Sequence, residues 1–168
     1  TAQEAHMQFT VDEVHSQSSL PIALTITAEL VADAAPITST SHDLSSRQQT
    51  SASIEWSPRT SGAAGELLTS PNIAELLSEV ASLDSWATGN AVMVLIHRST
   101  DPWGGGSRWV NADGPNGPVL TYTYSIDSAT DGDIACGVTV SGDAAHQQGV
   151  ATRDHIYSFA LPVDHTGV

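Results

Sequence analysis

The chain contains no lysine, and its five basic residues are all arginines. They stand against 19 acidic residues, which gives the 168-residue chain a formal net charge of −14. Nucleic-acid backbones and anionic membrane surfaces recruit clustered cations, so neither is an expected partner. Because the sequence is acidic and rich in serine and threonine, we expect a protein of the cell exterior or the cell surface.

Cysteine is almost absent as well. Cys136 is the only one, so the chain can form no internal disulfide and no cysteine-based zinc site. No apolar run approaches the roughly 18 residues of a membrane-spanning helix, so insertion into a membrane is not expected. A chain of this length suits one domain, which buries roughly 70% of the surface that its unfolded form exposes.

The sequence also lacks the short motifs of common catalytic centres. Its seven histidines are scattered without the HExxH spacing of a metal site, and no GxSxG turn presents a serine nucleophile. No group of residues supplies a nucleophile, a base and an orienting partner together. We therefore expect a protein that is not an enzyme and that needs no cofactor.

Alternation of apolar and polar residues is the dominant pattern that is present, and it is typical of strands with one buried face. In residues 5–11 the apolar positions are Ala5, Met7, Phe9 and Val11. Residues 91–97 are apolar at successive positions, which favours a central strand. The other predicted strands are 22–31, 51–56, 108–110, 119–126, 134–140 and 155–161, and a long polar surface connection is expected at 33–49.

One segment has a helical period instead. Its apolar residues recur at the spacing of one helix face: Ile73, Leu76, Leu77 and Val80. Ser70 before them is the expected N-cap and Pro71 the first helical residue, which predicts an amphipathic helix over 71–83. The whole pattern predicts an all-β fold, a jelly-roll-like antiparallel β-sandwich of about eight strands with this one short helix.

Five stretches follow one another along the chain: AHMQFTVDEV, LTITAEL, TSASIEWSP, SPNIAELLSEVASLDSWATGNAVMVLI and GPVLTYTY. Together they resemble a repeated β-sandwich domain of large secreted proteins of aquatic microbes, a family related to the DNRLRE-type jelly-roll carbohydrate-binding modules. The likeness covers roughly residues 5–124 and is most specific in the helix–Trp–strand block 70–96. It implies that the opening strand is preceded by two further strands, for which this chain has candidates only at its other end.

The resemblance divides the sequence into a β-sandwich body, 1–126, and C-terminal strands, 127–168, that complete a sandwich. We expect that sandwich to be the one of the next copy. A circular permutant, one unit of a tandem array and a subunit that lends its last strands all fit, and strands that fold back onto their own domain are the simpler alternative. The expected assembly strands contain Val138, Val140, His155, Tyr157, Phe159 and Leu161, and the expected acceptor strand contains Met7, Phe9 and Val11.

If the C-terminal strands complete the sandwich of another copy, a structural role for the protein is expected. The chain is expected to be a subunit or repeat of an extracellular filament, a head-to-tail homopolymer assembled by β-strand complementation. Tyr157, Phe159 and Leu161 share one face of the last strand, and burial of each is worth about 2 kcal/mol. The sequence leaves open whether successive units are separate subunits or repeats of one polypeptide.

The alternative function is that of a carbohydrate-binding module in a secreted multidomain protein. Trp103 and Trp109 flank three glycines near Asn111 and Asp113, and indole rings with polar neighbours can stack on a sugar and hydrogen-bond to it. The competing structural interpretation is that both indoles plug one end of the sandwich.

A calcium site is the remaining hypothesis from the sequence. Asp127, Asp131 and Asp133 form an acidic turn around a glycine, and Ca²⁺ takes six to eight oxygen ligands. A solvated turn is the simpler interpretation, because the spacing is not that of an EF-hand.

Overall fold

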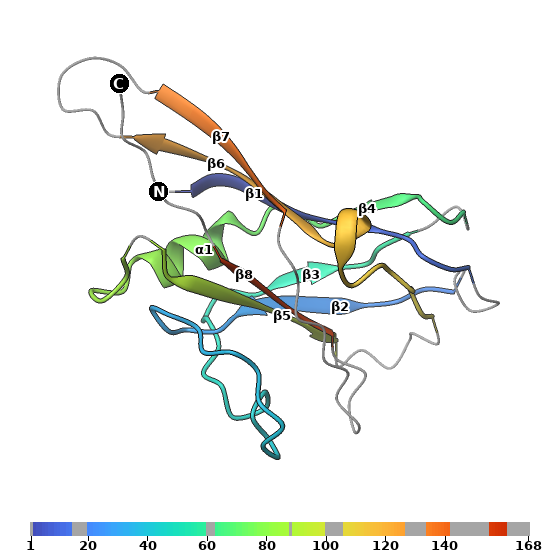
Figure 1. Ribbon diagram of the computed structural model, residues 1–168, viewed down its shortest axis with the longest axis horizontal. Coiled ribbons are helices and arrows are strands. Elements are labelled where there is room, and N and C mark those ends of the chain that lie inside the picture. Colours follow the sequence, from blue (N-terminus) through green and yellow to red (C-terminus); the bar gives the residue numbers. More distant parts are fainter. Residues whose placement is uncertain are drawn as a thin grey trace.

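The computed structural model describes residues 2–14, 20–59, 63–87, 89–99, 106–126, 134–141 and 155–160; residues 2–3 and 124–126 and the last two ranges are described as backbone alone. Two antiparallel four-stranded sheets lie face to face (Figure 1). In spatial order, one sheet holds β4 (Leu67–Thr69), β1 (Ala2–Thr10), β6 (Val119–Ile126) and β7 (Ile134–Ser141). The other holds β3 (Ile54–Trp56), β2 (Leu24–Ala28), β5 (Ala91–Arg98) and β8 (His155–Ala160).

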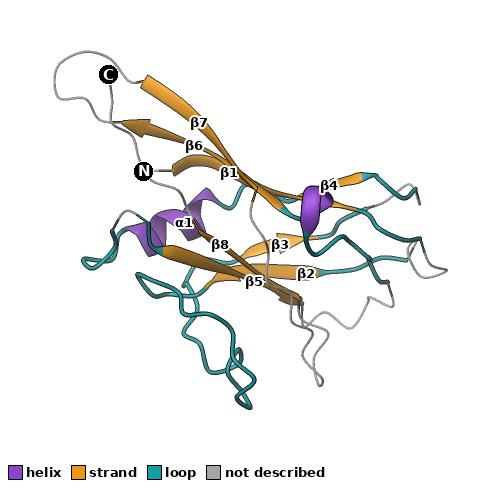
Figure 2. Cartoon of the chain, viewed as in Figure 1, coloured by secondary structure: helices purple, strands orange, loops and turns teal. Residues whose placement is uncertain are grey.

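Helical structure is confined, within the described residues, to α1 (Ala74–Ala81) and the single 3-10 turn η1 (Gly114–Asn116), as Figure 2 shows. The predicted all-β sandwich with one short helix is therefore confirmed. Two details differ from the sequence prediction. Residues 108–110 contribute only an isolated bridge, Val110 to Val11, and the strand β4 was not predicted because three residues are too few to establish a period.

The strand order is that of a jelly roll whose strands are counted from β3. In a jelly roll the first and last strands are neighbours in one sheet, and the two middle strands form a hairpin in the other. Counted from β3, the last strand is β2, which pairs with β3, and the middle strands are β6 and β7, which also pair. The orders of both sheets agree with this counting throughout.

The core lies between the two sheets and follows the predicted alternation. The alternating apolar residues of β1 from residue 5 onward, and that of the bridge after it, are buried: Ala5, Met7, Phe9 and Val11. They face Ile26 and Ala28 of β2 and the even-numbered apolar residues of β5. The ring of Phe9 stacks on that of Trp56 with centroids 5.6 Å apart, which links the two sheets directly.

The helix begins at Ala74 rather than at residue 71, and its predicted cap has another role. The Ser70 hydroxyl accepts the backbone N–H of Met7 at 2.9 Å and donates to the Pro71 carbonyl, so it joins the helix entrance to β1. Asn72 instead accepts the N–H of Ala74 at 2.9 Å with its side-chain oxygen, which meets a helix-terminal donor. The buried face of the helix carries the four residues that the period predicted.

Candidate functional site

The edge of β5 that faces β8 is the first candidate site. β8 pairs with β5 in antiparallel register from Ala91 opposite Ala160 to Ile96 opposite His155. It is the last strand in the order of its sheet. All residues from Val92 to Ile96 are buried, on both faces of the sheet. A strand with this composition requires a neighbour on each side, because an exposed apolar edge invites association with other chains.

The outer face of β5 is covered by the long connection between β2 and β3. Met93 and Leu95 form a small second core with Ala34, and Ile37 and Leu44 pack against it. The predicted polar surface connection at 33–49 therefore contains apolar contacts that fasten it onto the sheet. This covering explains why β5 is apolar at every position instead of alternating.

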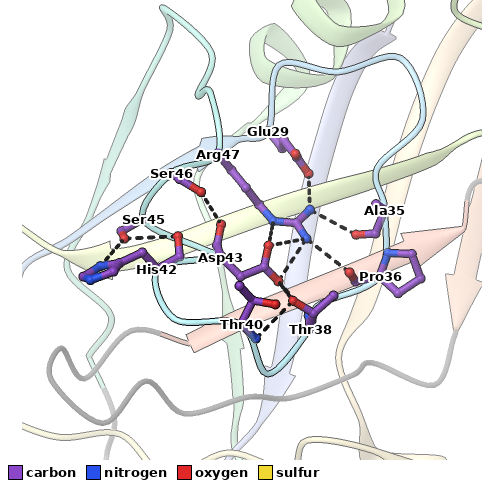
Figure 3. Close-up of polar contacts among 10 residues, drawn as sticks. All are labelled: Glu29, Ala35, Pro36, Thr38, Thr40, His42, Asp43, Ser45, Ser46 and Arg47. Carbon is purple, nitrogen blue, oxygen red and sulfur yellow. Dashed lines mark hydrogen bonds and ion pairs between the residues drawn. The ribbon is translucent and has the colours of Figure 1, made fainter.

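Arg47 holds the covering connection in place (Figure 3). Its guanidinium, with a side chain only 6% exposed, donates to Glu29 at 2.7 Å and to both oxygens of Asp43. The same group donates to the carbonyl oxygens of Ala35 and Pro36. The Arg47 side chain thus connects Glu29, just after β2, to two separate parts of the connection, residues 35–36 and Asp43.

The charges of this cluster stabilise one another. The pKa of Asp43 is lowered, first by the backbone N–H of Thr38 and then by the Thr38 hydroxyl and Arg47. Burial of Arg47 disfavours its charge, but Glu29 and Asp43 outweigh that effect and raise its pKa. The cluster is therefore a structural clamp in which the ionised forms of Asp43 and Arg47 favour one another. Sequence reasoning missed it, although the four-residue spacing of Asp43 and Arg47 is a weak local signal.

The expected acceptor residues Met7, Phe9 and Val11 do not lie beside the last strand. β1 is paired along one side with β4 and along the other with β6, so its ladder is occupied in both directions. The strand that receives β8 is β5, in the opposite sheet. The physical reason is that a strand buried as deeply as β1 takes a central place in its sheet, where no further strand can be added.

The edge strands of the sandwich differ in length. β3 and β4 are edge strands of three residues each, whereas β7 and β8 are edge strands of eight and six. Neither IACGVTVS of β7 nor HIYSFA of β8 contains Asp, Glu, Lys or Arg, the charged residues that commonly protect an edge. Val138 lies opposite Tyr122 and Val140 opposite Leu120 in the register with β6. Tyr157 and Phe159 lie opposite Val94 and Val92, and Leu161 falls outside the described residues.

A second candidate site lies where β1 ends. Trp109 is 53% exposed, so it does not plug the sandwich as the structural interpretation of its indole required. Its carbonyl accepts the N–H of Asp12, and the N–H of Asn111 donates to Thr10. These bonds place Trp109 beside Asp12 and Asn111 beside Thr10 on the outer face of the sheet. Asp113 is exposed before η1, and Trp103 lies outside the described residues.

Arg108 fixes the backbone at this end of the molecule. One terminal nitrogen of its guanidinium, Nη2, donates to the carbonyls of Leu20 and Pro58, at 3.1 and 2.9 Å. Burial lowers the pKa of Arg108, and attraction by Glu66 opposes that shift. Gly106 passes close to the same loop, because an added Cβ would come within 2.5 Å of the Leu20 carbonyl oxygen. These bonds hold together the loops that contain Leu20, Pro58 and Arg108.

The other hypotheses receive no direct support. Asp127, Asp131 and Asp133 lie outside the described residues, and the described part of the chain contains no cluster of three or more metal-ligating side chains. Among the same residues, no helix has both the length and the apolar character to cross a bilayer. Comparisons of the chain with protein-family models, curated proteins and solved structures gave no significant match.

Proposed function

We propose that this protein is a non-catalytic structural subunit or repeat of an extracellular filament, joined head to tail by β-strand complementation through residues 127–168. In this proposal β8 of one copy occupies the β5 edge of the next copy, in the register described above. Copies of the chain are the partners, and no cofactor is required. The observation that carries the proposal is that β5 is buried on both faces and has its edge covered by an uncharged terminal strand.

Within one chain β8 covers its own β5, and the same edge is chemically identical in every copy. Exchange between copies therefore replaces each ladder bond with an equal one, which is why strand exchange is a low-cost route to assembly. Residues 142–154 link β7 to β8 and span about 45 Å when fully extended, enough to reach a neighbouring molecule. The absence of lysine leaves the exchanged edge without its commonest protective residue.

A disulfide trap tests the exchange. Met93→Cys with Ser158→Cys places two thiols at directly paired positions of β5 and β8, in a Cys136→Ser background. After oxidation of the assembled protein, a denaturing non-reducing gel should show a ladder of linked chains. A product that runs only as a single chain would contradict strand exchange, and a product limited to linked pairs would contradict the filament.

Two further cysteine pairs make the trap specific. Thr121→Cys with Thr139→Cys joins β6 to β7, so interchain linkage there indicates that the whole of 127–168 is lent rather than β8 alone. Met93→Cys with His155→Cys is the matched negative control, because His155 lies opposite Ile96 and is three pairs out of register. It should form no specific product.

A carbohydrate-binding module is the second candidate, favoured by one observation. The exposed Trp109 lies beside Asp12 and Asn111, and this combination can stack on a sugar ring and bond to its hydroxyls. The test is retention on insoluble neutral polysaccharides. Trp109→Ala should abolish retention and Thr121→Ala, on the outer face of the same sheet, should not; equal elution of all three proteins would dismiss this candidate.

A further inference from the structure

We infer that the second core, which Met93, Leu95 and Ala34 form beneath the connection 33–49, is a recognition site that sets the register of the terminal strand. The residue of that strand that it recognises is Ile156. The inference rests on the proposed function, because it names what a β5 edge selects when it accepts β8 from any copy. Main-chain pairing gives an added strand its affinity, whereas sites for its alternate side chains give specificity.

The outer-face pairs of β5 and β8 are the closely spaced kind of antiparallel pair. The carbonyl of Met93 accepts the N–H of Glu29 at 2.9 Å, so the polar backbone groups of Met93 point toward β2 and not toward β8. Met93 and Ser158 are therefore a non-hydrogen-bonded pair, the kind in which Cα atoms lie only about 4.5 Å apart. Because the two kinds alternate, Leu95 and Ile156 form another close pair.

On the β2 side, the second core borders polar residues that already have partners. Thr27, opposite Leu95, is only 4% exposed, and its hydroxyl donates to the connection at 2.9 Å. Glu29, beside Met93, binds the guanidinium of the clamp. Met93 is nevertheless fully buried. The apolar surface therefore continues toward β8, where the register places Ile156.

The inner face of the terminal strand does not by itself fix the register. A shift of β8 by two residues keeps every residue on its own face of the sheet. In one direction, such a shift would bring Leu161 opposite β5 in place of His155, while Tyr157 and Phe159 would stay on the inner face. That set is more apolar than the observed one. The inner face alone thus favours the shifted register, and the observed register needs another cause.

The outer face opposes this shift. It would move Ile156 from Leu95 to a place opposite His97, and it would bring Ser158 opposite Leu95. The close apolar pair would be lost, and a hydroxyl would be placed beside an apolar core. A shift in the other direction would place the carboxylate of Asp154 opposite Leu95, at a still larger cost. The observed register is the one that brings an isoleucine to the second core.

Moving this isoleucine along the strand tests the inference. Ile156→Ser combined with Ser158→Ile keeps the composition of β8 and leaves its inner face unchanged. The strand should then shift by two residues, because the isoleucine at its new position lies opposite Leu95 only in the shifted register. The ratio of shifted to observed register should rise about tenfold or more, the effect expected for relocation of one buried apolar side chain.

Two pairs of introduced cysteines measure this ratio in the full chain. Ala160→Cys links to Ala91→Cys in the observed register and to Met93→Cys in the shifted one. Each pair is placed, together with Cys136→Ser, in the parent and in the exchanged protein. All proteins are equilibrated in the same glutathione buffer, and the linked fractions are measured on a denaturing non-reducing gel.

Two further variants make the test specific. Tyr157→Phe with Phe159→Tyr is the matched control, an exchange on the inner face that should leave the register unchanged. Leu44→Ser weakens the cover of the second core without altering the terminal strand, and it should raise the shifted fraction. This variant decides the question if far-UV circular dichroism shows that the exchanged protein does not fold.

The gel also separates this inference from the proposed function. Links that form only within single chains remove the proposed function, and a shifted register in the exchanged protein then still supports the recognition site. Ladders of linked chains, with the observed register unchanged in a folded exchanged protein or in Leu44→Ser, overturn the recognition site and leave the proposed function standing. A folded exchanged protein that links through neither cysteine pair also overturns the recognition site.

Discussion

Arg47 is the residue on which the covering of β5 depends most. It is one of five cations in the chain and is buried against two carboxylates and two carbonyl oxygens. Removing one member of a buried ion pair is costly, because the remaining charges keep the cost of their burial without the compensating attraction. The cluster therefore decides whether the connection stays closed over Met93 and Leu95.

Arg47→Met should lower the free energy of unfolding and the urea midpoint, since it leaves Glu29 and Asp43 without their cation but keeps the aliphatic stem. The loosened connection should also increase binding of a hydrophobic dye. Urea denaturation followed by tryptophan fluorescence measures the first effect. Arg59→Met, at an exposed arginine, is the matched control and should change the midpoint little; equal midpoints for the two variants would refute the clamp.

At the scale of elements, helix α1 is fastened to the segment that precedes β3 by Glu79. Its carboxylate accepts the N–H groups of Ser51 and Ala52 at 2.8 and 3.1 Å, and the Ser51 hydroxyl at 3.1 Å. The Ser51 N–H, followed by that of Ala52, holds the pKa of Glu79 below its ordinary value of 4.5. Protonation of the Glu79 carboxylate is therefore linked to the packing of α1 against this segment.

This link gives a defined pH dependence. Because the pKa of Glu79 is lower in the folded chain, its contribution is present above pH 4.5 and disappears as the pH falls through the folded value. Glu79→Gln should therefore lower the urea midpoint near neutral pH and reduce the loss of stability on acidification. Asp84→Asn, at an exposed position in the turn after the helix, is the control. Parallel pH profiles for Glu79→Gln and the parent would show that the carboxylate is not linked to folding.

At the scale of the whole molecule, the net charge and the edge strands have opposite effects on association between copies. The net charge of −14 keeps copies apart, while the long edge strands without Asp, Glu, Lys or Arg favour contact between them. Repulsion between exposed charges is screened by salt, with a Debye length of about 10 Å at 0.1 M. Backbone ladders and apolar contacts are not weakened in this way.

Association should therefore increase with ionic strength. Raising sodium chloride from about 0.02 M to about 0.5 M reduces the Debye length severalfold, so the mass distribution should shift to larger species. Light scattering at fixed protein concentration measures this shift. A decrease in mass with salt would indicate that ion pairs hold the copies together, contrary to the proposed contacts.

Local patterns of apolar residues were enough to predict most strands of the sandwich and its one helix. The alternation in β1 and the continuous apolar run of β5 predicted a half-buried and a central strand, and the spacing of Ile73 to Val80 predicted the buried face of α1. These patterns are local, because the period of buried residues follows directly from backbone geometry. The helix start was misplaced because Ser70 bonds to Met7, which is distant in sequence.

The neighbours of each element, in contrast, depend on the complete fold. It placed β8 on β5 instead of β1, folded the polar-looking 33–49 connection over Met93 and Leu95, and left Trp109 exposed. None of these results follows from a period, because strand order and burial depend on contacts between residues far apart in the chain. The local sequence determines which side chains of a strand can be buried. The position of the strand in a sheet depends on how all strands pack together around one core.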